Sequence, residues 1–155
     1  MVTILDGKKA ARGVLRQTKR RIGSTRIRLV IIQVGHRPDS DIYIRQKLRA
    51  AEVVGVKAEV VSLPVTVRQA RLVKVIDRLN RDASVQGILL QLPLPSHLDT
   101  HRVVETISPR KDIDGFHSKS LVVSPLILSL LNLLQLAHPV KKNSAVILGA
   151  SSVFS

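Results

Sequence analysis

The 155-residue chain has no cysteine, no tryptophan, one tyrosine and two phenylalanines. Without cysteine it can form neither a disulfide nor a thiolate zinc site, and it offers no cysteine nucleophile. Residues of apolar type nevertheless make up 45% of the sequence. We therefore predict a globular domain whose core is built almost entirely from aliphatic side chains.

Acidic residues are few compared with basic ones. The chain has 11 Asp and Glu and 25 Lys and Arg, which gives a formal net charge of +14. Such a surplus is compatible with nucleic-acid binding. The basic residues are scattered, however, and the aromatic rings on which single-stranded bases stack are nearly absent. We interpret most of the charge as solvated helix faces and do not expect a nucleic-acid partner. A basic nucleic-acid-binding module remains an alternative.

A long apolar run is also missing. The most apolar stretch, residues 121–136, is interrupted by polar residues and a proline and is too short for a membrane span. We interpret it as a buried helix that needs partners on several sides. The first residues show no basic segment followed by an apolar one, so we expect no secretory signal, no membrane contact and a cytoplasmic location.

Short apolar runs that alternate with amphipathic segments indicate the fold class. Continuous apolar runs at residues 29–34, 58–63, 85–92 and 144–148 predict strands that are buried on both faces, as in a parallel sheet. Strands that alternate with helices are typical of an α/β fold, with βαβ units and a parallel sheet flanked by helices.

Five segments between and after these runs predict helices. The first is capped by Asp6 and runs to about residue 22, and the fourth and fifth cover residues 100–107 and the segment after Pro125. Ser40 or Asp41 caps the second, which ends at Gly55. Thr66 caps the third. The core-facing residues that helical spacing predicts on this third helix are Ala70, Val73, Ile76 and Leu79.

Several polar residues stand where chemistry is possible. Tyr43 and Lys47 are four residues apart and share a helix face. Gln91 ends an apolar strand, at the edge where open α/β sheets bind ligands. Asp112 and Asp114 lie in one loop, too few carboxylates for a predicted metal site. The plainer interpretations are an exposed lysine, an amide that satisfies backbone groups, and a turn.

Three segments resemble, in order, the motifs of one enzyme family. VGHRPDSDIYIRQKLRAA at residues 34–51 resembles V-G-x-x-x-x-S-x-x-Y-[VI]-x-x-K-x-[KR]-A. GILLQLPLP at 87–95 resembles G-x-x-[VL]-Q-L-P-L-P, and SPRKDIDGFH at 108–117 resembles P-x-K-D-V-D-G-[FL]. LDGK at 5–8 fits the family's start. Over residues 1–117 the chain is similar to the bifunctional methylenetetrahydrofolate dehydrogenase/methenyltetrahydrofolate cyclohydrolase family.

The resemblance implies a function in one-carbon metabolism. Such enzymes oxidise 5,10-methylene-tetrahydrofolate with NADP or NAD and hydrolyse the methenyl product to 10-formyl-tetrahydrofolate. By resemblance, Lys47 is the catalytic general acid/base, Gln91 its hydrogen-bonding partner, and Tyr43 packs its ring on the folate. The implied partners are tetrahydrofolate derivatives and a second copy in a homodimer. The other residues implied in substrate binding are Ser40, Leu92, Pro93, Asp114 (to the pterin) and Gly115.

After His117 the likeness weakens. Ser124-Pro125 is what resembles the family's P-C-T-P-x-G segment, and VILGASSVFS at 146–155 resembles V-x-G-x-S-x-x-V-G-x-P, with Gly149, Ala150 and Ser151 as a remnant of the cofactor site. We predict a folate-binding catalytic domain over 1–120. An interdomain helix and only the first strand of a Rossmann-like second domain would occupy 121–155. We expect the 155-residue chain to bind no NAD(P) and to have lost the dehydrogenase step. The alternative is a non-catalytic truncated fragment or pseudoenzyme.

Overall fold

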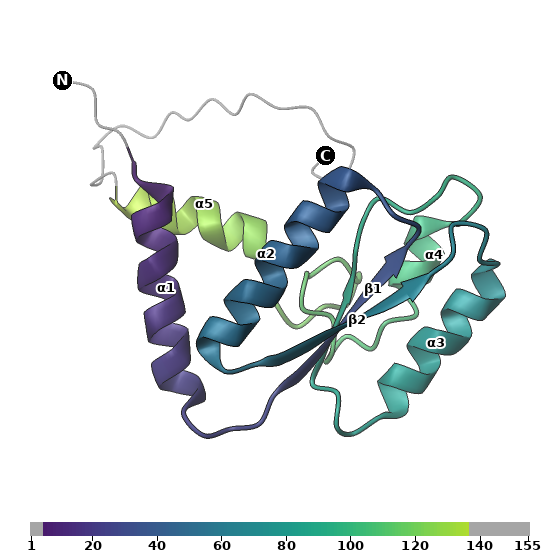
Figure 1. The fold of residues 1–155 in the computed structure, drawn as a ribbon, viewed down its shortest axis with the longest axis horizontal. Helices are drawn as coiled ribbons and strands as arrows, with labels where there is room; N and C mark the ends of the chain where they lie inside the picture. The colour runs from purple at the N-terminus through teal and green to yellow at the C-terminus, as the bar shows by residue number, and fades with distance from the viewer. Residues whose placement is uncertain (1–4, 137–155) are drawn as a thin grey trace.

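The computed structural model describes residues 5–136, and over this range strands alternate with helices (Figure 1). Their order is α1 (Gly7–Ile22), β1 (Arg28–Val34), α2 (Pro38–Val54), β2 (Lys57–Leu63), α3 (Gln69–Arg81), β3 (Gly87–Leu90), α4 (Thr100–Val104) and α5 (Pro125–Leu136). The strands form one parallel sheet in the order β2-β1-β3. The predicted α/β fold is confirmed. The strand expected at 144–148 and Gly149, Ala150 and Ser151 lie outside the described residues.

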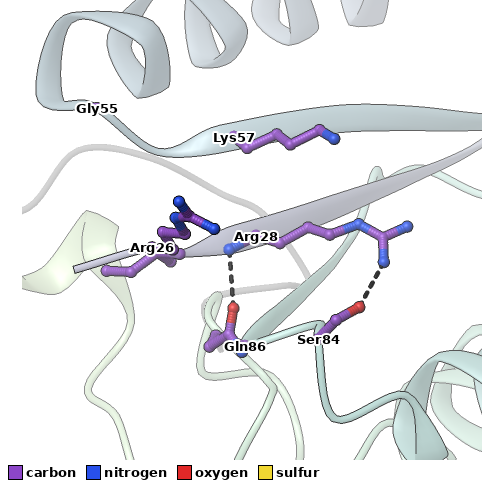
Figure 2. Close-up of a pocket in the computed structure, with 7 residues that line it drawn as sticks. Arg26, Arg28, Gly55, Lys57, Ser84 and Gln86 are labelled. Atoms are coloured by element: carbon purple, nitrogen blue, oxygen red, sulfur yellow. Dashed lines mark hydrogen bonds between the residues drawn. The ribbon is translucent and has the colours of Figure 1, made fainter. Parts of the chain in front are cut away.

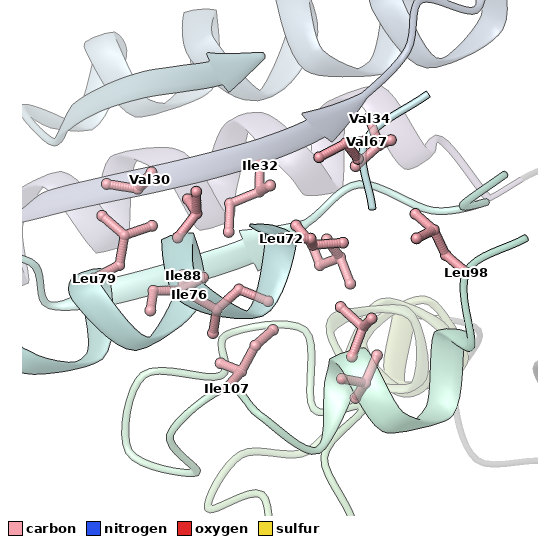
Figure 3. Packing of buried hydrophobic residues seen from close by; sticks show 14 of the residues in the cluster. Val30, Ile32, Val34, Val67, Leu72, Ile76, Leu79, Ile88, Leu98 and Ile107 are labelled. Carbon is pink, nitrogen blue, oxygen red and sulfur yellow. The ribbon is translucent and has the colours of Figure 1, made fainter. Parts of the chain in front are cut away.

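Helices cover both faces of the sheet. On one face α3 and α4 close the larger core cluster, in which Ile32 and Ile88 pack against Leu72 and Ile76 (Figure 3). On the other face α2 brings Ile44 against the sheet. Strands buried on both sides need the continuous apolar runs that the sequence contains. α1 packs on α2 and not on the sheet, and α5 lies beside α1 (Figure 1).

The ends of the first two helices confirm two predictions and correct one. Asp6 caps α1 by accepting a hydrogen bond from the Lys9 backbone N–H at 2.9 Å. α2 ends at Gly55 in the left-handed conformation, with φ 84°. The predicted start of α2 was wrong, because its N-cap is Arg37 and the helix begins at Pro38. Proline has its φ pre-set for the first turn of a helix, so Ser40 and Asp41 lie inside α2.

The third helix begins later than predicted. Thr66 lies in the preceding turn, where the Val67 N–H donates to the Pro64 carbonyl at 2.9 Å, and the N-cap is Arg68. The predicted core face is partly wrong: Ala70 is exposed and Val73 half-buried. The buried residues of α3 are Leu72, Val75, Ile76 and Leu79.

Two other elements are shorter than predicted. β3 covers Gly87–Leu90, since its pairing with β1 ends at Leu90, and the Leu92-Pro93 peptide bond is cis. α4 covers Thr100–Val104, with Asp99 as its N-cap accepting from the Arg102 N–H at 3.0 Å. In both cases the predicted segment extends past the residue at which the hydrogen-bonded element ends.

The apolar segment after Pro125 is a helix, as predicted, but it is not buried. No residue of α5 is buried, and Leu134 is 61% exposed. Within residues 5–136 no helix combines the length and hydropathy needed to span a membrane.

Candidate active site

An open cavity of about 190 Å³ lies at the carboxyl end of the sheet, where ligands bind in open α/β folds. α2 contributes Lys47, the end of β3 contributes Gln91, and the loop after α4 contributes Asp114. The other lining residues are Leu90, Leu92, Phe116, Ser124, Pro125 and Leu126. One amine, one amide and one carboxylate therefore share a cavity whose other lining residues are apolar apart from Ser124.

Lys47 is half-buried, and its Nζ donates a hydrogen bond to Gln91 Oε1 at 3.2 Å. Burial lowers the pKa of Lys47 below its ordinary value, because it penalises the charged ammonium. The negative charge of Asp114 acts in the opposite direction and raises the pKa of the lysine. Lys47 is thus an amine poised to exchange protons more readily than an exposed lysine.

Gln91 is held so that its carbonyl oxygen faces the lysine. Its backbone N–H donates to the Ile32 carbonyl of β1 at 2.8 Å. Its side-chain Nε2 donates to the Leu92 carbonyl at 2.8 Å, which leaves Oε1 for Lys47. The amide therefore presents an acceptor to the amine and holds it at the edge of the sheet.

The loop that carries Asp114 is clamped at its start by Lys111. The Lys111 Nζ donates to the carbonyls of Leu79 and Asp82 at the end of α3, at 2.9 and 2.7 Å. The Lys111 carbonyl in turn accepts from the Ile88 N–H of β3 at 2.7 Å. This motif lysine stabilises the loop and the helix end, and it does not line the cavity.

The two carboxylates of this loop have different surroundings. Asp112 is buried and its Oδ2 accepts from the His117 N–H at 3.0 Å, which closes the loop on itself. Asp114 lines the cavity, and burial raises its pKa, with a smaller contribution from the charge of Asp112. Lys47 opposes that rise and favours the charged carboxylate.

Gly115 allows the next segment to close over the loop. Its φ is 70°, and a Cβ there would lie 2.9 Å from the Ser124 nitrogen and 2.9 Å from the Val122 oxygen. Only glycine fits both the conformation and the contact. Ser124 and Pro125, which resemble part of the family's wall segment, are thereby brought to the cavity.

Four of the residues predicted for the site do not line this cavity: Ser40, Tyr43, Pro93 and Gly115. Ser40 is buried and lines an adjacent narrow gap together with Gln91 and Pro93. Tyr43 is 60% exposed on α2. The structure therefore brings together Lys47, Gln91, Leu92 and Asp114, with Gly115 directly beside them.

Sequence reasoning missed two residues near the site. Phe116 lines the cavity. The sequence feature that could have identified it is a rare aromatic residue directly after the Asp-Gly turn. Gln33 lines the narrow gap beside Ser40 and is 5% exposed. The sequence feature that could have identified Gln33 is a polar residue inside the apolar run of β1.

A second cavity, of about 330 Å³, lies at the opposite, amino end of the sheet and is basic (Figure 2). Arg26, Arg28 and Lys57 contribute to its lining. The Arg28 guanidinium already pairs with Glu59 at 2.5 Å and Asp82 at 3.1 Å. These pairs join β1 to β2 and to the loop after α3. The positive charge of Arg28 is therefore paired with carboxylates of the protein itself.

We predict that Lys111→Ala destabilises the domain by roughly 1.5–3 kcal/mol, because it removes two charge-assisted hydrogen bonds at a helix C-terminus. Urea unfolding followed by circular dichroism measures this free energy. Lys74→Ala, which removes an exposed lysine from the same helix α3, is the matched control and should change stability by less than about 0.5 kcal/mol. Equal stabilities of the two variants would contradict the clamp.

Comparison with known proteins identifies the family of the chain. Residues 5–114 match the model of the tetrahydrofolate dehydrogenase/cyclohydrolase catalytic domain. Bifunctional protein FolD 2 of Pseudomonas putida is 43% identical over 123 residues, covering 76% of this chain and 41% of the relative. Bifunctional protein FolD of Moorella thermoacetica is 44% identical over 118 residues, covering 73% and 42%. The chain thus spans less than half the length of these relatives.

Solved structures of similar proteins support the same family assignment. A 5,10-methylenetetrahydrofolate dehydrogenase from the silkworm Bombyx mori is similar with a TM-score of 0.73 and 39% identity, covering 76% of this chain and 42% of that one. The bifunctional FolD methylenetetrahydrofolate dehydrogenase/cyclohydrolase of Campylobacter jejuni has a TM-score of 0.81 and 33% identity, covering 87% and 53%. Lys47, Gln91 and Asp114 all fall within the matched catalytic domain. The chain belongs to the tetrahydrofolate dehydrogenase/cyclohydrolase family.

Proposed function

We propose that this chain acts on tetrahydrofolate derivatives in one-carbon metabolism, and that its cavity carries out methenyltetrahydrofolate cyclohydrolase chemistry. The observation that carries the proposal is the half-buried Lys47 amine, held 3.2 Å from Gln91 Oε1 in a cavity that also contains Asp114. Family membership supports the folate substrate class. The Campylobacter jejuni relative is named as a bifunctional methylenetetrahydrofolate dehydrogenase/cyclohydrolase, which supports the proposed reaction.

The reaction needs proton transfer at two positions. Water adds to the bridging carbon of the methenyl cation and gives up a proton, which neutral Lys47 accepts. The bond from this carbon to N5 then breaks, N5 takes a proton from the Lys47 ammonium, and the hydroxyl proton leaves to solvent. The formyl group stays on N10, and the overall reaction releases one proton. A lysine whose pKa is lowered by burial suits both transfers.

The remaining residues would orient the ligand. The Asp114 carboxylate accepts hydrogen bonds from the pterin amino and ring N–H groups, a contact strengthened by its charge. Leu92, Pro93 and Gly115 supply the walls near the strand end and the loop. Tyr43, exposed on α2, has room to lay its ring against the folate. Ser40 shapes the first turn of that helix.

The cofactor and assembly proposals go beyond the cavity. A Trypanosoma brucei relative was solved with NADP and an inhibitor, at 28% identity. We propose a folate-binding domain over 1–120 and the start of a nucleotide-binding domain over 121–155. We propose that the 155-residue polypeptide, assayed by itself, binds no NAD(P) and transfers no hydride. Homodimer formation and a cytoplasmic location stay predictions from the sequence.

The proposal is tested by the hydrolysis of 5,10-methenyl-tetrahydrofolate with the purified chain, against the buffer-catalysed rate. We expect a rate above that background, and saturable binding of 10-formyl-tetrahydrofolate by calorimetry. Binding without turnover would support the alternative of a non-catalytic folate-binding fragment. Neither turnover nor binding by the folded chain would overturn the proposed function.

A further inference from the structure

Gln33 is a buried amide in a strand that is otherwise apolar from residues 29 to 34. Its Nε2 donates to Asp41 Oδ1 on α2 at 2.5 Å. Within residues 5–136, no other side-chain hydrogen bond joins β1 to α2. A buried amide that lost this partner would carry the cost of an unsatisfied donor, so the bond strongly favours one placement of the helix.

This bond helps to fix the start of α2, where the Ser40 N–H also donates to Asp39 Oδ1 at 2.9 Å. Its N-cap, Arg37, makes no capping hydrogen bond and instead pairs with Asp39 at 3.0 Å. Asp41 is the other carboxylate of the first turn and is directed to the sheet. Asp41 also lies near His36, whose Nδ1 is 3.8 Å from Oδ1.

The same strand end holds both partners of the candidate active site. The Ile32 carbonyl accepts the backbone N–H of Gln91, and the next residue, Gln33, bonds the helix that carries Lys47. Ile44 and Leu48 of α2 add apolar packing against the sheet. Apolar attraction is not directional, whereas a hydrogen bond between two side chains has a preferred geometry.

We propose that Gln33 and Asp41 are positioning residues, which fix α2 on β1 and thereby set Lys47 Nζ against Gln91 Oε1. This inference deepens the proposed function and rests on it. Catalysis by a positioned amine is sensitive to displacement on the order of 1 Å. A loosened α2 would therefore lower the turnover rate while leaving the folate contacts of Asp114, on another loop, in place.

The kinetic test compares Gln33→Leu with Asp41→Asn. Gln33→Leu removes the donor and should lower kcat for methenyl-tetrahydrofolate hydrolysis about ten- to a hundredfold, with a smaller change in KM because Tyr43 lies on the same helix. Asp41→Asn keeps the Oδ1 acceptor and should stay within about threefold of the unaltered chain. Gln33→Leu combined with Asp41→Ala should be no worse than Gln33→Leu alone. An unchanged kcat in folded Gln33→Leu would overturn the proposal.

A second measurement does not need turnover. Titration of the Lys47 side chain by NMR reports its surroundings, and in Gln33→Leu we expect the pKa of Lys47 to rise toward its ordinary value as the amine becomes better solvated. Asp112 and Asp114 are intact in that variant, and Asp41→Asn controls for the charge of Asp41. If the chain hydrolyses nothing but this shift occurs, positioning is supported and the proposed function fails. If the pKa of Lys47 in Gln33→Leu equals that in the unaltered chain, the positioning role is overturned.

Discussion

Lys47→Ala should lower the cyclohydrolase rate by about 10²- to 10⁴-fold, the usual contribution of a positioned general acid/base. The amine accepts the proton of the attacking water and returns one to N5, and alanine can do neither. Lys47→Arg should be nearly as slow, because a guanidinium stays protonated at working pH and cannot act as a base. Initial rates of methenyl-tetrahydrofolate hydrolysis, corrected for buffer catalysis, measure the effect.

Lys74→Ala is the matched control for this prediction, since it removes an exposed lysine on α3 and should leave the rate unchanged. Stability should change little in Lys47→Ala, by no more than about 1 kcal/mol, because burial already penalises the charged amine. A Lys47→Ala variant with the rate of the unaltered chain would show that proton transfer does not pass through this residue.

Asp114→Asn should weaken folate binding by about 10- to 100-fold, and it should also move the pH–rate profile. The loss in affinity corresponds to about 1.5–3 kcal/mol for hydrogen bonds to a charged acceptor. Neutral Lys47 is the reactive form, so the rate rises as pH increases through the pKa of Lys47. The charge of Asp114 raises that pKa. Its removal lowers the pKa of the lysine and shifts the rising limb to lower pH.

The matched control is Glu52→Gln, which removes a carboxylate from an exposed position of α2. It should leave both the KM and the pH profile unchanged. A rising limb that stays in place or moves to higher pH in Asp114→Asn would mean that Asp114 does not act electrostatically on Lys47. An unchanged KM would remove Asp114 from the folate contacts.

The family and the fold class could be predicted because their signals are local in the sequence. Apolar runs of strand length, separated by helical periodicity, indicate a parallel α/β sheet wherever they occur. The three motifs preserve residue type and spacing, so they identify Lys47, Gln91 and Asp114 before any contact is known. The starts of α2 and α3 were misplaced, since several nearby residues could cap each helix and packing selects among them.

The sequence by itself determined which residue types are available to the site, and only the tertiary structure decided how they are used. Lys47 and Gln91 are 44 residues apart, and their contact exists because α2 and β3 both pack on β1. Asp112 and Asp114 are two residues apart, yet one is buried in a backbone hydrogen bond and the other lines the cavity. Gln33 is a polar residue within an apolar strand, and only the fold places Asp41 of α2 opposite it. Hydrophobic periodicity depends on near neighbours, whereas hydrogen bonding, burial and pKa depend on residues that only the folded chain brings together.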